Sequence, residues 1–236
     1  MCYGTLITIE RGNTLTAFLL KMIAVITMLI DHIGAVFRGF APVIFRSVGR
    51  IAFPIFAYMI AQSCLHTKSL GKYLLRLGIF AVVSEVPFDL AFRNNISFIS
   101  KTNIFYTLFL GVACITLYEK LKSKSKILAV LPALPLIFLA EVLGADYGAF
   151  GVILIFLLYL AYPKKRITRA VILTVGMAYL YGLSFVRPWY FLFSLAAVLM
   201  VLLYNGKEGV KAKWAFYAFY PLHLVLLVAI LRLGFI

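Results

Sequence analysis

Residues 16–37 read TAFLLKMIAVITMLIDHIGAVF, and this stretch decides the fold class of the protein. A helix of about 20 mostly apolar residues crosses the hydrocarbon core of a bilayer. The stretch is too long for the apolar region of a signal peptide, and no small-residue cleavage site follows it. We therefore expect a retained first helix that begins on the cytoplasmic side. Its ionisable residues Lys21, Asp31 and His32 then lie inside a membrane span, where such side chains are rare and usually functional.

The composition of the whole chain agrees with a membrane protein. Of its 236 residues, 64% are hydrophobic and 13% are charged, whereas soluble domains carry about 25% charged residues. Such a chain cannot cover a globular surface with polar side chains, so lipid must be its main solvent. Three cysteines without a CxxC pair support neither a disulfide framework nor a zinc motif. No linker divides the chain, and we treat residues 1–236 as a single domain.

Apolar segments recur along the chain and predict an all-α, polytopic bundle of about nine transmembrane helices. The segments span roughly residues 16–37, 44–65, 72–92, 104–120, 127–143, 147–162, 168–186, 188–204 and 214–234. The fifth and sixth segments are short, and Pro132 and Pro135 interrupt the fifth. A re-entrant pair or one bent hairpin is therefore an alternative to two full crossings at that point.

The positive charges alternate from loop to loop. The chain carries 23 Lys and Arg against 8 Asp and Glu, a net charge of +15. With a cytoplasmic N-terminus, every even-numbered loop is basic, including the alternating lysines of residues 120–126 and the Lys-Lys-Arg run of residues 164–166. This distribution follows the positive-inside rule and predicts a multi-pass inner-membrane protein whose basic loops contact anionic lipid on the cytoplasmic side. We expect no nucleic-acid partner.

Ionisable residues also gather near the outer ends of the predicted spans. They are Asp31 and His32 in the first span, Arg46 and Arg50 at the start of the second, Glu85 and Asp89 in the third, and Asp146 beside Tyr147 in the turn before the sixth. Inside a span each costs at least about 2.5–3.5 kcal/mol, so it needs a partner, water or a function. We expect these side chains to form one polar pocket at the outer end of an apolar bundle.

Helical spacing suggests partners within this polar pocket. Glu85 and Asp89 are four residues apart and therefore share one helix face. Together with Asp31 they are the nearest available counterions for Arg50. Such ion pairs can also serve only to fix the helix register. His223, in the last span, is either a hydrogen-bonded interhelical histidine or a substrate contact.

Familiar catalytic and metal motifs are missing from the sequence. It contains no GxSxG elbow, no HExxH helix and no GxxxxGKS/T phosphate loop. The three histidines are far apart in the sequence and lack the spacing of metal ligands. We therefore expect no metal cofactor.

Short sequence blocks occur in a fixed order along nearly the whole chain. They are Lys21-Met-Ile-Ala24, Met28-Leu-Ile-Asp-His-Ile-Gly34, Gly49-Arg-Ile-Ala-Phe-Pro-Ile-Phe56, Tyr73-Leu-Leu-Arg76, Ser84-Glu-Val-Pro-Phe-Asp89, Asn103-Ile-Phe-Tyr-Thr-Leu108, Ala140-Glu141 with Asp146-Tyr-Gly148, and Phe219-Tyr-Pro-Leu-His-Leu224. In this order and at this chain length, the blocks resemble the TraX family, bacterial membrane proteins named for the pilin N-acetylase of conjugation systems.

The resemblance implies transfer of an acetyl group from acetyl-CoA, with the amine at a pilin N-terminus as the named acceptor. It also implies kinship with a wider group of integral-membrane acyltransferases. These share a basic residue followed about three turns later by a histidine in the first helix. Lys21 and His32 take these places here, with Lys where Arg is common. Many TraX-like chains lie outside conjugation systems, so a peptide amine, a sugar, a lipid headgroup and a small amine all remain open as acceptors.

The residues of the polar pocket suggest a mechanism for acyl transfer, which requires a base, oxyanion donors and aligned substrates. We predict that His32 is the base and that Asp31 orients it. Arg50 would hold a carboxylate, a phosphate or the oxyanion, in a position set by Glu85 and Asp89. Further substrate contacts are predicted at Lys21, Asn103, Asp146, Tyr147 and His223. Direct transfer and an acyl-enzyme intermediate are both open.

The two ends of the predicted bundle suggest how acetyl-CoA enters. Acetyl-CoA is cytosolic, whereas the polar pocket lies toward the outer face. We therefore expect the acyl arm to enter from the basic inner side, where Lys21, Lys72 and Arg76 are candidate phosphate contacts. The same three residues also fit a simpler role as positive-inside anchors.

Two other classes of function fit the same residues. Buried acids and histidines also form proton relays, so a proton-coupled transporter or channel is one alternative, although we find no inverted repeats. A non-catalytic assembly factor or lipid-binding scaffold is the other. Binding of acetyl-CoA separates the acetyltransferase from both alternatives.

Overall fold

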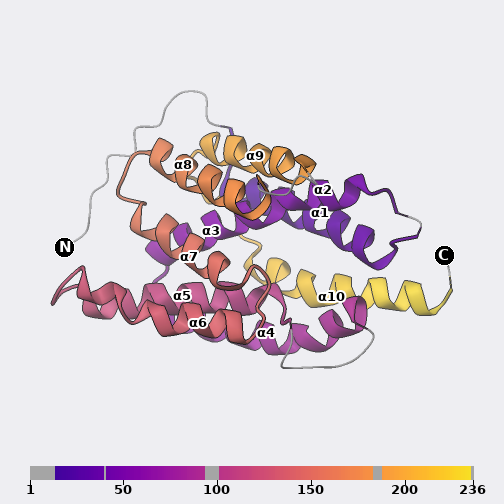
Figure 1. Ribbon diagram of the computed structural model, residues 1–236, viewed down its shortest axis with the longest axis horizontal. Coiled ribbons are helices and arrows are strands. Elements are labelled where there is room, and N and C mark those ends of the chain that lie inside the picture. Colours follow the sequence, from indigo (N-terminus) through magenta and orange to yellow (C-terminus); the bar gives the residue numbers. More distant parts are fainter. Residues whose placement is uncertain (1–13, 40, 94–100, 183–187, 235–236) are drawn as a thin grey trace.

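The computed structural model describes residues 14–39, 41–93, 101–182 and 188–234 (Figure 1). Within these residues the chain forms helices and no β-strand, so the predicted all-α fold class is confirmed. The predicted end of the seventh segment, at residue 186, lies outside the described residues.

The helices follow one another along the chain with short connections. They are α1 (Ala17–Val36), α2 (Ile44–Val48), η1 (Gly49–Ile51), α3 (Ala52–His66), α4 (Leu70–Phe92), α5 (Ile104–Leu121), η2 (Leu128–Val130), α6 (Ala133–Val142), α7 (Gly148–Leu160), α8 (Arg166–Met177), η3 (Ala178–Gly182), α9 (Pro188–Leu202) and α10 (Lys213–Arg232). Every predicted apolar segment contains a helix, and most predicted ends lie within two residues of the observed ones.

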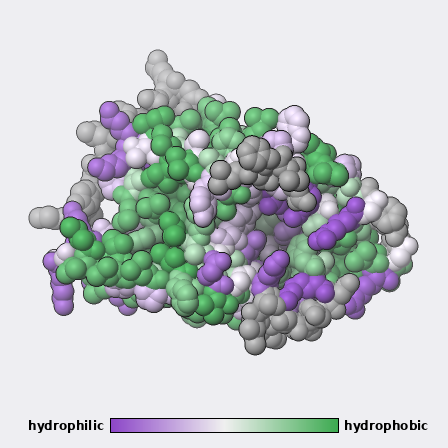
Figure 2. Space-filling view, in the orientation of Figure 1, coloured by the Kyte–Doolittle hydropathy of each residue, from purple (hydrophilic) through white to green (hydrophobic). Residues whose placement is uncertain are grey.

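Several of the described helices are apolar enough to lie in a membrane. Four segments are long and apolar enough to cross a membrane, namely Ala17–Val36, Ile44–His66, Ile104–Leu121 and Lys213–Arg232. Shorter apolar helices span Leu128–Val142, Gly148–Leu160 and Pro188–Leu202. Apolar residues cover much of the face shown in Figure 2, as expected for a surface in contact with lipid. These features indicate a membrane protein, while nine full crossings remain a prediction.

The fifth predicted segment is interrupted where its first proline lies. The 3₁₀ turn η2 ends at Val130, and α6 begins only at Ala133, directly after Pro132. Proline has no N–H group and is therefore tolerated at the start of a helix rather than in its interior. The short helix α6 packs with α7 against α5.

The helices place two chemically different ends at opposite sides of the molecule (Figure 1). At the first, which we call the basic end, α1 and α4 begin, α3 ends, and the lysine-rich residues 120–126 connect α5 to η2. At the second, which we call the polar end, α1 and α4 end and α2, α5 and α7 begin. The polar end therefore collects most of the residues of the predicted polar pocket.

Polar side chains fix the starts of three long helices. Thr16 caps α1 and Ser69 caps α4, each by accepting a hydrogen bond from a backbone N–H of the first turn. Asn103 caps α5 by accepting from the N–H of Phe105 at 3.0 Å. Such caps satisfy donors that a helix leaves unpaired at its first turn. Asn103, predicted as a substrate contact, thus has a structural function in the fold.

Helix α1 and the turn η1 come into direct contact where Gly49 faces Asp31. A Cβ atom at position 49 would overlap with the side chain of Asp31. Only glycine permits so close an approach of the two backbones. Because Gly49 precedes Arg50, this approach also brings Arg50 beside Asp31.

Candidate functional site

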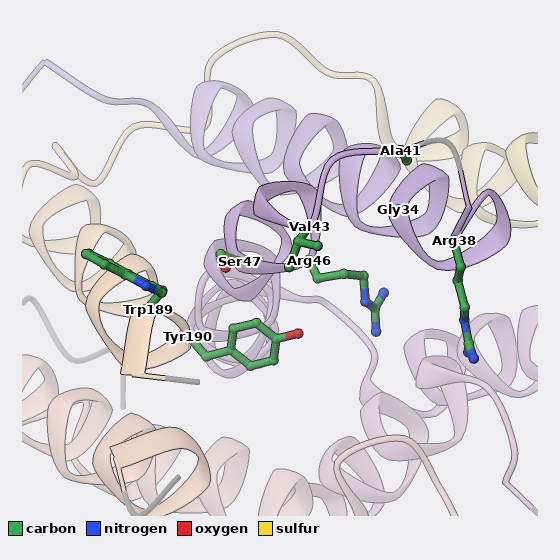
Figure 3. A pocket seen from close by; sticks show the side chains of 8 residues that line it. All are labelled: Gly34, Arg38, Ala41, Val43, Arg46, Ser47, Trp189 and Tyr190. Atoms are coloured by element: carbon green, nitrogen blue, oxygen red, sulfur yellow. The ribbon is translucent and has the colours of Figure 1, made fainter. Parts of the chain in front are cut away.

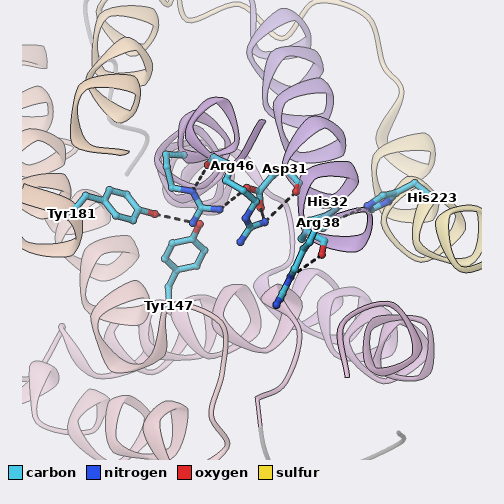
Figure 4. Close-up of polar contacts among 9 residues, drawn as sticks. Asp31, His32, Arg38, Arg46, Tyr147, Tyr181 and His223 are labelled. Carbon is cyan, nitrogen blue, oxygen red and sulfur yellow. Dashed lines mark hydrogen bonds and ion pairs between the residues drawn. The ribbon is translucent and has the colours of Figure 1, made fainter. Parts of the chain in front are cut away.

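A pair of histidines joins α1 to α10 at the centre of the candidate site (Figure 4). The Nδ1 atom of His32 lies 2.7 Å from the Nε2 atom of His223. The Nδ1 atom of His223 lies 2.8 Å from the backbone oxygen of Phe219. A carbonyl oxygen only accepts, so Nδ1 of His223 must donate. A neutral His223 then accepts at Nε2, His32 donates from Nδ1, and the Nε2 atom of His32 carries the free lone pair.

Aromatic rings hold the two imidazoles in this orientation. Phe92 and Tyr220 meet the ring of His32 edge to face, at centroid distances of 5.1 and 5.9 Å. The ring of Phe219 stacks on His223 at 4.7 Å. Contacts of this kind limit rotation of a side chain and exclude water from one side of it. The predicted site residues His32 and His223 are therefore brought together, although 191 positions separate them in the sequence.

Asp31 is held by two arginines rather than by His32. Its carboxylate oxygens lie 2.7 Å from a terminal nitrogen of Arg46 and 2.6 Å from one of Arg50. The predicted orientation of His32 by Asp31 is therefore wrong, and His223 takes that part. Consecutive residues of a helix point about 100° apart, so Asp31 and His32 face different neighbours.

Glu85 and Asp89 do not hold Arg50, contrary to the prediction. Oε2 of Glu85 accepts hydrogen bonds from Nδ2 of Asn103 at 2.5 Å and from its backbone N–H at 3.3 Å. Asp89 instead forms an ion pair with Arg93, four residues later, at 3.3 Å. Both acids are fully buried. Glu85 thereby connects α4 to the residue that caps α5, and Asp89 contacts the residue that follows the end of α4.

The turn before α7 completes the surroundings of Arg50. Tyr147 adopts a left-handed conformation with φ of 65°, which is uncommon for a residue with a side chain and often marks a functional site. Its ring stacks on Phe53 at 3.6 Å. Arg50 also donates a hydrogen bond to the hydroxyl of Tyr181, which lies 3.5 Å from the Tyr147 hydroxyl. The predicted site residue Tyr147 therefore belongs to the Arg50 cluster, together with neighbouring Asp146.

Two members of this cluster were not among the predicted site residues. Arg46, which was expected in the polar pocket but had no catalytic or binding role assigned, shares Asp31 with Arg50. Tyr181 lies in η3. It is one of 14 tyrosines in the chain, and nothing in the sequence distinguishes it from the others. Hydrophilic side chains gather around a hollow in the surface, right of the centre in Figure 2.

Asp146 gives this cluster a pH dependence. Asp146 is exposed as a residue, yet protein atoms surround its carboxyl closely. This desolvation raises the pKa of the carboxyl to about 6, while the charge of Arg50 opposes the shift. A carboxyl with a raised pKa in the folded state stabilises the fold when it is protonated. Its contribution is complete below the ordinary pKa of 3.8 and is lost as the pH rises through about 6.

We therefore expect wild type to gain thermal stability relative to Asp146→Asn as the pH falls from neutral toward 4. Asn stays neutral at every pH in this range, so the difference between the two unfolding midpoints reports the effect of protonating Asp146 on stability. The measurement is thermal unfolding of both proteins in detergent across this pH range. A difference that stays constant with pH would contradict the raised pKa.

A chamber of about 500 Å³ lies between the basic end and the histidine pair. Its lining includes Lys21, Val25, Met28, Phe56, Met59, Ile60, Gln62, Ser63, His66, Tyr73, Arg76, Leu77, Ile104, Phe105, Leu108, Tyr204, Glu208, Lys213, Phe216, Tyr217 and Tyr220. Cationic residues lie at its basic end, and Tyr220, which contacts His32, lies at the other. Lys21, a predicted substrate contact, therefore belongs to the chamber rather than to the polar end.

Arg76 lines the chamber and has one donor that is unpaired within the described ranges. Its Nε atom is buried and has no hydrogen-bond partner among the described residues. Its guanidinium group lies 5.5 Å from the ring centre of Tyr73. A buried donor without a partner costs free energy, which an anionic ligand could recover. In the described part of the chain, no three His, Cys, Asp or Glu side chains gather in a way that could hold a metal ion.

Comparison with known proteins identifies the relatives of this chain. The family described as TraX protein matches residues 17–231. The chain is also 28% identical, over 239 aligned positions, to the probable fimbrial assembly protein FimC, serogroup H1, of Dichelobacter nodosus, covering 92% of this chain and 96% of that protein. No solved structure matches the chain. Because the family match extends over nearly the whole sequence, the chain belongs to the TraX family of membrane proteins.

Proposed function

We propose that this protein is a membrane-embedded acetyltransferase that moves an acetyl group from acetyl-CoA to an amine or hydroxyl acceptor. The observation that supports this most is the chamber, which runs from cationic residues at the basic end to the side of His32. A chamber of this size is within the range of ligand pockets, and its long apolar wall suits an acyl arm. The family membership supports the same reaction class through the resemblance to pilin N-acetylase.

The proposal includes an orientation in the cell membrane. We infer a multi-pass protein with the N-terminus and the basic end in the cytoplasm, because that end carries the lysine-rich connection of residues 120–126. Acetyl-CoA then reaches the mouth of the chamber directly from the cytosol. Lys21, Arg76 and Lys213 are the cations that would bind its phosphate groups.

His32 is the proposed general base. Its Nε2 atom accepts the proton of the acceptor amine or hydroxyl as the acceptor attacks the thioester carbonyl. The new N–C or O–C bond forms, the C–S bond breaks, and the CoA thiolate takes the proton from His32. Throughout, His223 accepts the hydrogen bond from Nδ1 of His32 and holds the ring in one tautomer.

Arg46 and Arg50 are the proposed source of positive charge for the oxyanion. Both charges lie close enough to act on the His32 imidazole. Three interactions hold the Arg50 side chain: an ion pair with Asp31, a hydrogen bond to Tyr181, and a hydrogen bond to the backbone oxygen of Arg46 at 3.0 Å. Such fixed groups need no reorganisation when charge develops in the transition state. Asp31 accordingly acts as a positioning residue.

The acceptor is proposed from the relatives rather than from the chamber. One relative carries a fimbrial assembly name, and the resemblance to the TraX family implies a pilin amine as acceptor. The amine at the N-terminus of a pilin or another peptide is therefore the first acceptor to test. The same names also favour a second candidate function, an assembly factor that binds a pilus component without catalysis.

Binding of acetyl-CoA tests the proposal. We expect acetyl-CoA to raise the midpoint of thermal unfolding of the purified protein in detergent, because a ligand at about 100 times its Kd stabilises the folded state by roughly 2.7 kcal/mol. Arg76→Gln should weaken this effect, since Arg76 lines the chamber. Lys124→Gln is the matched control, because Lys124 is an exposed cation of the basic end outside the chamber lining.

Three results would separate the candidate functions. Stabilisation by acetyl-CoA that depends on Arg76 supports the acetyltransferase and justifies a screen of peptide amines. No stabilisation of folded protein at high acetyl-CoA, together with proton-coupled flux in liposomes, would favour the transporter. No stabilisation and no flux, with capture of a pilin, would leave the assembly factor.

A further inference from the structure

A second cavity, the arginine cleft, opens at the polar end with a volume of about 430 Å³. Its lining is formed by Gly34, Arg38, Ala41, Val43, Arg46, Ser47, Trp189 and Tyr190 (Figure 3). In Figure 3 the guanidinium groups of Arg38 and Arg46 and the hydroxyl of Tyr190 point into the same open space. None of the lining residues belongs to the chamber, which approaches the histidine pair from the other end.

The cleft contains cationic nitrogens without counterions. Arg38 uses only its Nε atom, which donates to the backbone oxygen of Ala35 at 3.1 Å. Arg46 uses one terminal nitrogen, which contacts both the carboxylate and the backbone oxygen of Asp31. The remaining guanidinium nitrogens of both make no hydrogen bond to another described residue, and no described acid lines the cleft. Asp31, the acid that contacts Arg46, is already shared with Arg50.

Two adjacent guanidinium groups are a binding arrangement for an anion. Each presents planar, forked N–H donors that match the oxygens of a phosphate or a carboxylate. Arg46 is partly compensated by Asp31, whereas Arg38 forms no ion pair with a described residue, so an anion in the cleft would gain an interaction with the Arg38 charge. Trp189, with 62% of its surface exposed, adds a flat apolar wall beside the charges. The cleft thus suits a molecule with an anionic group next to an apolar or ring-shaped part.

We infer that the arginine cleft binds the acceptor through an anionic group, a phosphate or a carboxylate, held by Arg38 and Arg46. That the bound molecule is the acceptor rests on the proposed function, whereas the anion site itself rests on the cleft alone. Arg46 connects the two sites, because it lines the cleft and its charge also acts on His32. An acceptor anchored here would present its amine or hydroxyl from the side opposite to acetyl-CoA.

Trp189 supplies a direct readout of binding that does not depend on catalysis. The chain has two tryptophans, and the other, Trp214, lines neither cavity. In a Trp214→Phe background, fluorescence therefore reports on the cleft. We would titrate inorganic phosphate, glycerol 3-phosphate and N-acetylglycine at constant ionic strength, in nanodiscs of phosphatidylcholine. A saturable change in Trp189 fluorescence is expected with at least one of these anions.

Variants of Arg38 decide whether the response belongs to the cleft. Arg38→Gln should raise the apparent Kd by about tenfold, because it removes a charge-assisted pair of hydrogen bonds. Arg38→Lys keeps the charge but loses the fork and should fall between Gln and wild type. Arg232→Gln is the matched control, since it removes an exposed arginine at the far end of α10 and should leave the Kd unchanged.

A parallel titration distinguishes a lipid headgroup from a soluble acceptor. Nanodiscs with phosphatidylglycerol would change Trp189 fluorescence in an Arg38-dependent way if the anion is a lipid phosphate, and the soluble anions would then compete. No saturable response to any anion or to phosphatidylglycerol overturns the inference, as does an equal response in Arg38→Gln. Thermal stabilisation by acetyl-CoA is measured on the same protein, so failure of the cleft and failure of the proposed function are separate results.

Discussion

Replacing His32 with Asn is expected to lower the rate of acetyl transfer by about 10²- to 10⁴-fold, the usual contribution of a general base. The side-chain amide of Asn can still donate to Nε2 of His223 in place of Nδ1 of His32, so the contact between α1 and α10 is kept. The variant loses the lone pair on Nε2 of His32, which is the proposed proton acceptor. The measurement is the initial rate of CoA release in the presence of a peptide acceptor, with acetyl-CoA stabilisation recorded in parallel.

Variants of His223 provide the control for this result. His223→Gln retains an acceptor for the Nδ1–H of His32 and should keep more activity than His223→Ala, which leaves the His32 tautomer unfixed. Rescue by Gln over Ala is a result that a purely packing role would not give. Turnover near the wild-type rate in His32→Asn, with the protein folded, would remove His32 from the role of base.

The largest loss of stability is expected for Asp31→Asn. Removing one partner of a buried ion pair typically costs about 3–5 kcal/mol, because the opposite charge is left uncompensated. Here two arginines depend on one carboxylate, although Arg46 is 34% exposed, which places the expected loss at about 3 kcal/mol, the lower end of that range. The measurement is chemical unfolding of both proteins in detergent.

A matched acid-to-amide change elsewhere tests whether the effect is specific. Glu119 pairs with Lys122 at a partly exposed position, and Glu119→Gln should cost no more than about 1 kcal/mol. Combining Asp31→Asn with Arg46→Gln should recover part of the lost stability, because one uncompensated charge is removed. A loss for Asp31→Asn as small as that for Glu119→Gln would show that the cluster contributes little to stability.

The positions of the helices could be predicted from the sequence because they depend on local properties. An apolar run, a capping residue such as Asn103 and a breaking residue such as Pro132 all act within a few positions of themselves. The number of crossings was less predictable, since α6, α7 and α9 are shorter than a full span. Their apolar composition is the same as that of the longer helices.

The pairs within the site could not be predicted, because they depend on which helices become neighbours. His32 was assigned to Asp31 by adjacency, whereas the packing of α1 on α10 gives it His223. For Arg50 the sequence left Asp31, Glu85 and Asp89 open as counterions, and the close approach permitted by Gly49 selects Asp31. The spacing of residues along one helix predicts which of them share a face, but it does not predict which other helix packs against that face.

The chamber reaches Tyr220, which contacts His32, and the arginine cleft includes Arg46, whose charge acts on the same histidine. In the proposed orientation, only the two-carbon acyl unit would pass from one aqueous compartment to the other. The bulky nucleotide carrier would stay in the cytosol, where metabolism regenerates it. A bacterium could then modify molecules beyond its membrane without exporting an activated reagent, and hydrolysis of the thioester outside the cell would never drain the internal pool.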